Sequence, residues 1–350
     1  MSVAAVVSKV VLTTAAFVLG VWAFFKTQAV TKEYFEPIMA ACSSSSNDYG
    51  SVNEFAEATG YHPYDTRVGL VVLDPFICIL TQFIHNLVET YPAGLLSWGA
   101  MLITSIPVTV LITLEAGRRG STGLLLYPTG ITLLCQLLGI SIIFPVVWVP
   151  AYYLGANPAG SVSMQRSKMA VFFLVSPVVI TMLVFVFLED TQRSLWTLLV
   201  GILAGPILPL QNLFVWSVGP PPDKLSPFLV MKNAELAATS YGLAGLVALL
   251  GWFYWMYVVL TTYSTDYESL WKDLWTEATP AVQFMTIDAT ILWASLVLHI
   301  GSRSLKSMME ALLYTPFFGP GAACSMALAS LELASIPALS PELISGKKTT

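Results

Sequence analysis

The stretch Leu95–Gly120, LLSWGAMLITSIPVTVLITLEAGRRG, places charged residues directly after an apolar run. The run has about 20 residues, the length needed to cross the hydrocarbon core of a bilayer. Glu115 precedes Arg118 and Arg119 by three and four positions. These offsets share one face of a helix, so a carboxylate and a guanidinium can meet. The stretch is either the polar cap of a membrane helix or part of a site that faces into a helical bundle.

The composition supports a membrane protein. The chain has 350 residues, of which 56% are hydrophobic and 11% charged, and its mean hydropathy is +0.73. A soluble domain carries about 25% charged residues. We therefore predict an all-α, polytopic membrane bundle that forms a single transmembrane domain over residues 1–350. The net charge of -5 is spread along the chain, which argues against a nucleic-acid partner.

Eight apolar segments predict membrane helices: Val10–Phe25, Val68–Val88, Leu95–Leu114, Thr122–Tyr153, Met169–Leu188, Leu195–Val218, Glu235–Thr262 and Ala281–Ile300. The fourth is long for one span and is expected to be a tilted or kinked helix. Leu312–Ile336 is a weaker ninth segment. Pro316, Gly319 and Pro320 interrupt it, so it is either re-entrant or interfacial.

Two polar stretches flank or connect these spans. Residues 27–67 form the longest loop, with Glu54 and Glu57 on an expected short amphipathic helix. The loop is either a solvated connector or a lid, and residues 337–350 are a polar tail. Cys42, Cys78, Cys135 and Cys324 are isolated in sequence, without a CxxC or CxxH motif. We expect them to pack as small hydrophobic residues and not to form a metal or redox site.

Simple alternation of the spans predicts where the polar groups gather. The loops after odd-numbered spans then share one side, which also lies near the starts of the spans that carry Asp74 and Asp288. Acids and arginines are expected to converge there, including Glu115 and Glu189. Lysine and arginine counts are similar on the two sides, so the orientation is undecided at this point.

A buried carboxyl suggests proton chemistry. Apolar surroundings disfavour the ionised form, so the group can act as a general acid near neutral pH. The candidate acids are Asp74, Glu115, Asp190 and Asp288. Each has a structural alternative, namely helix capping, hydrogen bonding to a neighbouring helix or, for Glu115, an ion pair with Arg118.

Further residues are candidates for binding a substrate. Aromatic ring faces stabilise a cation electrostatically, although Trp and Tyr also form ordinary belts at membrane interfaces. The binding candidates are Arg118, Glu189, Arg193, Gln136, Asn212, Trp148, Tyr127 and Trp252. His85 and His299 are expected to form core hydrogen bonds.

The order of several short patterns resembles one family. Leu73-Asp74-Pro75-Phe76, Leu114-Glu115-Ala116-Gly117-Arg118 and Tyr127-Pro128-Thr129 are followed by Gln192-Arg193-Ser194-Leu195-Trp196. This order, with the number of spans, resembles the fungal membrane-bound terpene cyclases of the ascofuranone and macrophorin meroterpenoid pathways. The resemblance covers about residues 10 to 335. The sequence lacks the aspartate cluster of magnesium-diphosphate terpene chemistry, as well as GxSxG, HExxH and P-loop motifs.

The resemblance implies a cyclase of the endoplasmic reticulum membrane. Its substrate is a farnesyl-type chain on an aromatic or polyketide head, and cyclisation starts by protonation of an epoxide or olefin without a metal cofactor. Glu115 beside two arginines departs from what a proton donor needs. Two other functions stay open: a secondary transporter, because broken helices and intramembrane carboxyls occur in transporters, and a membrane scaffold without chemistry.

Overall fold

The computed structural model describes residues 3–43, 52–61, 73–157, 160–168, 170 and 226–335, and these residues form helices without a β-strand among them. The all-α prediction is confirmed. Four of the described helices are long and apolar enough to cross a bilayer: Val7–Val30, Ala93–Ala116, Phe228–Thr262 and Pro280–Arg303. A count of eight spans is not confirmed. The expected fifth and sixth spans lie outside the described residues, apart from Ala170.

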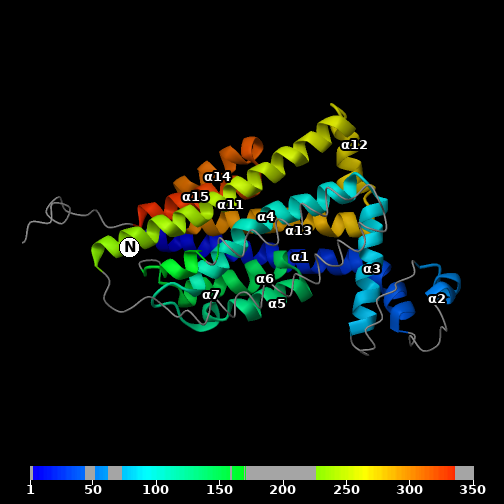
Figure 1. The fold of residues 1–350 in the computed structure, drawn as a ribbon, viewed down its shortest axis with the longest axis horizontal. Coiled ribbons are helices and arrows are strands. Elements are labelled where there is room, and N and C mark those ends of the chain that lie inside the picture. Colours follow the sequence, from blue (N-terminus) through cyan, green and yellow to red (C-terminus); the bar gives the residue numbers. More distant parts are fainter. Residues whose placement is uncertain are drawn as a thin grey trace, which may run out of the picture.

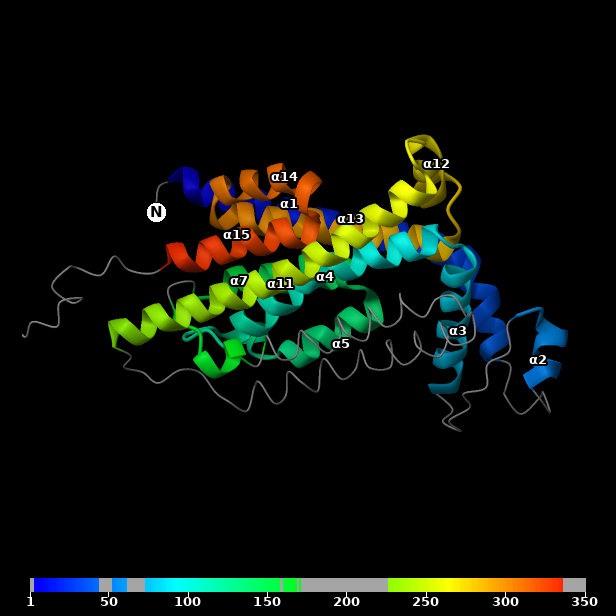
Figure 2. The same ribbon diagram turned by 45° about the horizontal axis from the view of Figure 1, so that its top comes forward.

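Four long helices, α1 (Val3–Ser43), α4 (Ala93–Ala116), α11 (Pro227–Thr262) and α13 (Pro280–Arg303), lie side by side in one bundle (Figures 1 and 2). α4 and α13 run in the same direction, because Ala93 packs with Ala281 at one end and Glu115 lies beside Arg303 at the other. We call the latter the Arg303 end. α11 runs in the opposite direction, because Tyr263 at its C-terminal end packs on Leu95 near the start of α4.

The expected fourth span, Thr122–Tyr153, is a helical hairpin and not one kinked helix. η1 (Gly123–Leu126) and α5 (Pro128–Leu138) form one arm, and α6 (Ile140–Ile143), η2 (Phe144–Trp148) and α7 (Val149–Gly155) form the other. Gly139 makes the turn with a φ of 94°, which favours glycine. The backbone N–H of Thr122 donates to the carbonyl of Gly155 at 2.8 Å, so both arms meet at the Arg303 end. We call this element hairpin A.

The expected ninth segment is part of a second hairpin, which we call hairpin B. α14 (Leu305–Phe318) and α15 (Pro320–Ala334) are joined at Gly319, whose φ is 81°. A Cβ on Gly321 would stand 2.2 Å from the backbone oxygen of Ile103, so the tip lies halfway along α4. Arms of 14 and 15 residues are about 21 Å long, shorter than the ~30 Å hydrocarbon core. The hairpin shape suits a re-entrant segment, whose depth in a bilayer stays a prediction.

Two expectations near the N-terminus are wrong. α1 continues to Ser43, so the loop predicted from residue 27 begins as helix; residues 27–43 contain no glycine, and Pro37 lies inside the helix. α3 (Leu73–Glu89) runs across the end of the bundle, not alongside α4, so Val68–Val88 is not a second span of the kind expected (Figures 1 and 2). The predicted short helix is confirmed as α2 (Val52–Thr59), which carries Glu54 and Glu57 on its exposed side.

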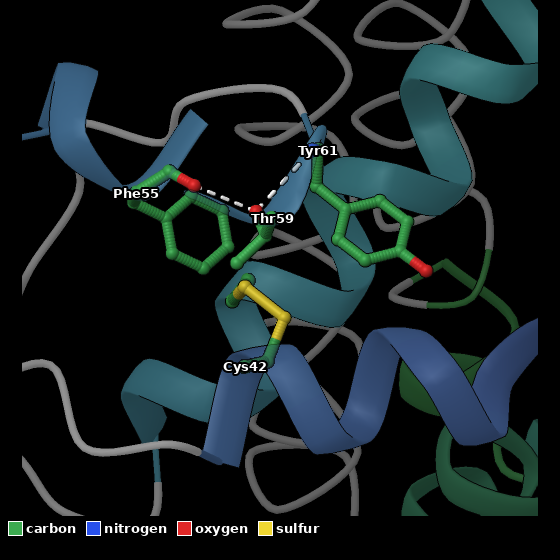
Figure 3. The surroundings of a disulfide bond; sticks show 5 residues. Cys42, Phe55, Thr59 and Tyr61 are labelled. Atoms are coloured by element: carbon green, nitrogen blue, oxygen red, sulfur yellow. Dashed lines mark hydrogen bonds between the residues drawn. A yellow bond between two sulfur atoms is a disulfide. The ribbon is translucent and has the colours of Figure 1, made fainter. Parts of the chain in front are cut away.

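A disulfide ties α1 to α3 at the end opposite Arg303, which we call the disulfide end. Cys42 and Cys78 are bonded, with their Cα atoms 5.8 Å apart. Phe55 of α2 is buried in the same cluster, and the Thr59 hydroxyl donates to the Phe55 carbonyl at 2.7 Å (Figure 3). The expectation that these cysteines pack as free thiols is therefore wrong. Their separation of 36 residues gives no short spacing motif from which the bond could be predicted.

The main core holds both hairpins against the long helices. It brings together buried side chains of hairpin A, α4, α11, α13 and α15, including Phe144, Leu111, Tyr241, Leu292 and Leu328. Small residues allow close contact, since a Cβ on Gly20 of α1 would stand 2.6 Å from the Pro145 ring of hairpin A. The packing fixes two places where buried charges meet neighbouring elements.

Candidate functional site

The predicted pair of Glu115 and Arg118 forms at the end of α4 and is completed by a third residue. The Arg118 guanidinium donates from Nε and Nη2 to the two Glu115 oxygens at 2.9 and 2.8 Å. Nη2 also donates to Oε1 of Glu332, on α15, at 2.6 Å. Both carboxylates are fully buried, at 0% and 1% exposure. The i, i+3 contact expected from the sequence is thus confirmed.

Arg303 makes the cluster a charge-balanced quartet. Its Nη2 lies 3.6 Å from Glu332 Oε1, and its Nη1 lies 4.0 Å from Glu115 Oε1. Two arginines therefore face two carboxylates. Burial lowers the pKa of Arg118, but the charges of Glu115 and Glu332 outweigh it and hold that pKa well above its ordinary value. Each arginine of the quartet thus lies close to both buried carboxyl groups.

Two connecting segments pack around the quartet. Arg118 Nη1 donates to the Gly160 carbonyl at 3.0 Å, and the Arg119 backbone N–H donates to the Ser161 carbonyl at 3.0 Å. A Cβ on Gly160 would stand 2.0 Å from the backbone oxygen of Arg119, so no other side chain fits there. Segment 117–122 and segment 160–163 are thereby fixed to each other. This part of the molecule is a rigid structural junction.

Sequence reasoning missed Glu332 and did not pair Arg303. Glu332 is the one carboxyl in the otherwise apolar stretch of residues 312–336. An acid inside an apolar helix is rarely placed there without a partner. The isolated acid therefore indicated that Glu332 has a partner, but nothing in the sequence identified that partner as Arg118, 214 positions away.

Asp288 has a different environment. It is buried in the third turn of α13, and it faces the tip of hairpin A. The hydroxyl and the backbone N–H of Ser141 donate to its carboxyl group. A Cβ on Gly139 would stand 3.4 Å from Oδ1. Among the described residues, no lysine or arginine forms an ion pair with Asp288.

Glu115 and Asp288 do not converge as the alternation of spans predicted. α4 and α13 are parallel, so Glu115 meets Arg303 at the end of α13. Asp288 precedes Arg303 by 15 positions, which is about 22 Å along the helix. The prediction failed because hairpin A returns to the side from which it starts, which removes one crossing from the expected count. The two carboxyls belong to two separate places.

The three aromatic candidates are also apart from one another. Trp148 is buried between Phe144 and Tyr152, with ring centroids 5.1 and 5.4 Å away, and is 5.2 Å from His299. Trp252 stacks on Trp255 and lies against the tip of hairpin B. Tyr127 is 60% exposed. The structure therefore does not gather them into one aromatic wall.

Other candidates are only partly placed. Asp74 lies in the first turn of α3 and Gln136 in α5, but their side chains lie outside the described part. Asp190, Glu189, Arg193 and Asn212 lie outside the described residues. His299 is buried among aromatic rings, and neither ring nitrogen has a hydrogen-bond partner in the described part of the chain, which differs from the expectation.

Comparison of the chain with protein-family models, with curated proteins and with solved structures found no match.

Proposed function

We propose that the protein is a metal-independent, membrane-bound terpene cyclase in which Asp288 donates the initiating proton. The substrate is a farnesyl-type chain on an aromatic or polyketide head, dissolved in the endoplasmic reticulum membrane. The order of the motifs around Asp74, Glu115 and Tyr127 supports this reaction class. The observation that carries the proposal is the contrast between Asp288, whose partner is a neutral serine, and Glu115, whose partners are arginines.

The choice of Asp288 follows from what a proton donor requires. A carboxyl must hold a proton before it can give one, and a neighbouring arginine favours the carboxylate instead. Glu115 contacts two arginines, so it serves the quartet. Asp288 is buried, and its partner Ser141 is uncharged. Of the two candidate acids whose side chains are described, Asp288 is the better one.

The reaction balances without another reagent. In the epoxide case the proton of the Asp288 carboxyl passes to the epoxide oxygen, which keeps the electron pair of the breaking C–O bond as a hydroxyl and leaves the positive charge on carbon. In the olefin case the π electron pair takes the proton, and the other carbon becomes the cation. A neighbouring double bond supplies the electron pair for the new C–C bond. The last cation loses a proton or is captured by an oxygen of the substrate, and solvent returns a proton to Asp288.

Product analysis tests the proposal. Membranes that contain the full-length protein should convert a prenylated or epoxidised phenol in the presence of EDTA. Asp288→Asn should abolish conversion at equal abundance, because the amide oxygen can still accept from Ser141 but the side chain has no acidic proton. Glu310→Gln is the matched control, since Glu310 pairs with Lys306 near the surface. Loss of turnover with EDTA, or full turnover of D288N, would contradict the proposal.

A secondary transporter is the second candidate, and the two hairpins favour it. Helices that end inside a bundle occur at transport sites, where their termini and freed backbone groups contact the cargo. Both hairpins turn at a glycine within the bundle, Gly139 beside Asp288 and Gly319 beside Trp252. Proton-driven uptake of an organic acid or phenol into proteoliposomes, together with no product formed, would support transport over cyclisation.

A further inference from the structure

The two ends of the bundle differ in chemistry in a way that bears on membrane orientation. The disulfide end carries α2, α3 and the Cys42–Cys78 bond, and the Arg303 end carries the quartet and the bases of both hairpins. Neither the resemblance nor the proposed reaction states which end faces the cytosol. The structure offers two independent observations on that question.

The first observation is the disulfide itself. Both cysteines are buried, at 5% and 0% exposure, and Phe55 covers them from a separate helix. The bond therefore belongs to the packed structure of this end and is not a chance contact of surface thiols. Disulfides form and persist in the lumen of the secretory pathway or outside the cell, whereas the cytosol keeps thiols reduced. The disulfide end accordingly belongs on the non-cytosolic side.

The second observation is the distribution of cations. The helix directions assign each described lysine and arginine to one end of the bundle or the other. At the Arg303 end lie Lys9, Arg118, Arg119, Arg166, Lys168, Lys232, Arg303 and Lys306. At the disulfide end the described residues contribute Lys26, Lys32 and Lys272. Segments rich in lysine and arginine remain on the cytosolic side of a membrane.

We infer that the protein sits in its membrane with the Arg303 end in the cytosol and the Cys42–Cys78 end in an oxidising, non-cytosolic compartment. The orientation could not be decided from the sequence, because simple alternation of the predicted spans places similar numbers of lysines and arginines on the two sides. The observed helix directions reassign them, and the cation bias then agrees with the disulfide. Both hairpins enter the bundle from the cytosolic side in this orientation.

Cysteine labelling in sealed vesicles with the cytosolic face outward tests the inference. Glu57 on α2 and Lys306 on α14 are both exposed and lie at opposite ends. K306C should react with a membrane-impermeant maleimide in intact vesicles, and E57C should react only after detergent is added. The parent protein gives the background from its own thiols, and a lumenal marker verifies that the vesicles are sealed. The reverse pattern would overturn the inference.

A second measurement follows the disulfide without depending on labelling at the surface. Denatured protein prepared with a thiol-blocking reagent should expose two further reactive thiols only after reduction. C42S/C78S should show no such increase, while C324S should show the same increase as the parent. Two thiols already reactive before reduction would overturn the inference, since the bond would then be absent from the protein in its membrane.

Discussion

Hairpins A and B are alike in shape, but a buried carboxyl contacts hairpin A at its tip and hairpin B at its base. Hairpin B is fixed at its base, where Glu332 joins the quartet with Arg118 and Arg303. Hairpin A is fixed at its tip, where Ser141 donates to Asp288. A carboxylate takes part in both contacts. The two buried acids therefore differ in their partners, which are arginines for Glu332 and a neutral serine for Asp288.

The largest effect should come from removing Arg118, the cation of the quartet that contacts Glu332 at the base of hairpin B. Arg118→Met leaves Glu115 and Glu332 with Arg303 alone, and loss of one partner from a buried ion pair costs about 3–5 kcal/mol of unfolding free energy. Thermal or denaturant unfolding in detergent measures this. The control is Lys306→Met, since an exposed pair contributes ~0–1 kcal/mol.

A second substitution at Glu115 tests whether Arg118 stabilises the protein through charge balance. R118M/E115Q removes one negative charge with the positive one, so it should recover part of the lost stability. Equal instability of the single and double variants would show that Arg118 acts through its hydrogen bonds to segment 160–163 and not through charge balance.

Alanine substitutions at the tips of the two hairpins should cause an intermediate loss of stability, which should be larger for hairpin B than for hairpin A. Gly319→Ala forces a residue with a Cβ into positive φ and places that atom 2.5 Å from the Trp252 ring. Left-handed backbone costs roughly 1–2 kcal/mol, and overpacking adds about 1–3 kcal/mol. Gly139→Ala carries the backbone cost alone, because its Cβ would stand 3.4 Å from Asp288. Unfolding of G139A at lower temperature than G319A would contradict this order.

The smallest effect should come from the partner of Asp288. Ser141→Ala removes the hydroxyl and leaves the backbone N–H as a donor, so the stability loss should be about 1 kcal/mol. If cyclisation is observed, S141A should keep measurable conversion while D288N has none. If S141A lost conversion to the same extent as D288N, proton donation would require both Ser141 and Asp288 and not the aspartate alone.

Local structure could be predicted from the sequence better than the topology of the chain. The run 95–114 predicted α4, and the offset of Glu115 and Arg118 predicted their contact. Prolines and glycines marked the break in hairpin B but did not show that the chain turns back there. Gly139 lies among apolar residues, so the sequence of hairpin A predicted one continuous span. Partners such as Glu332 and the Cys42–Cys78 bond depend on packing between distant segments, which no local spacing encodes.

The unbroken length of α1 has one more consequence. The same rod carries Cys42 at one end of the bundle and, farther back, Gly20 pressed against Pro145 of hairpin A. Pro37 lies between these two contacts and removes a backbone hydrogen bond of the helix, so α1 can bend at that point. One continuous helix therefore connects the disulfide-bonded cap to the returning arm of hairpin A, which carries Ser141 and its contact with Asp288, with a single proline as the place where that connection can yield.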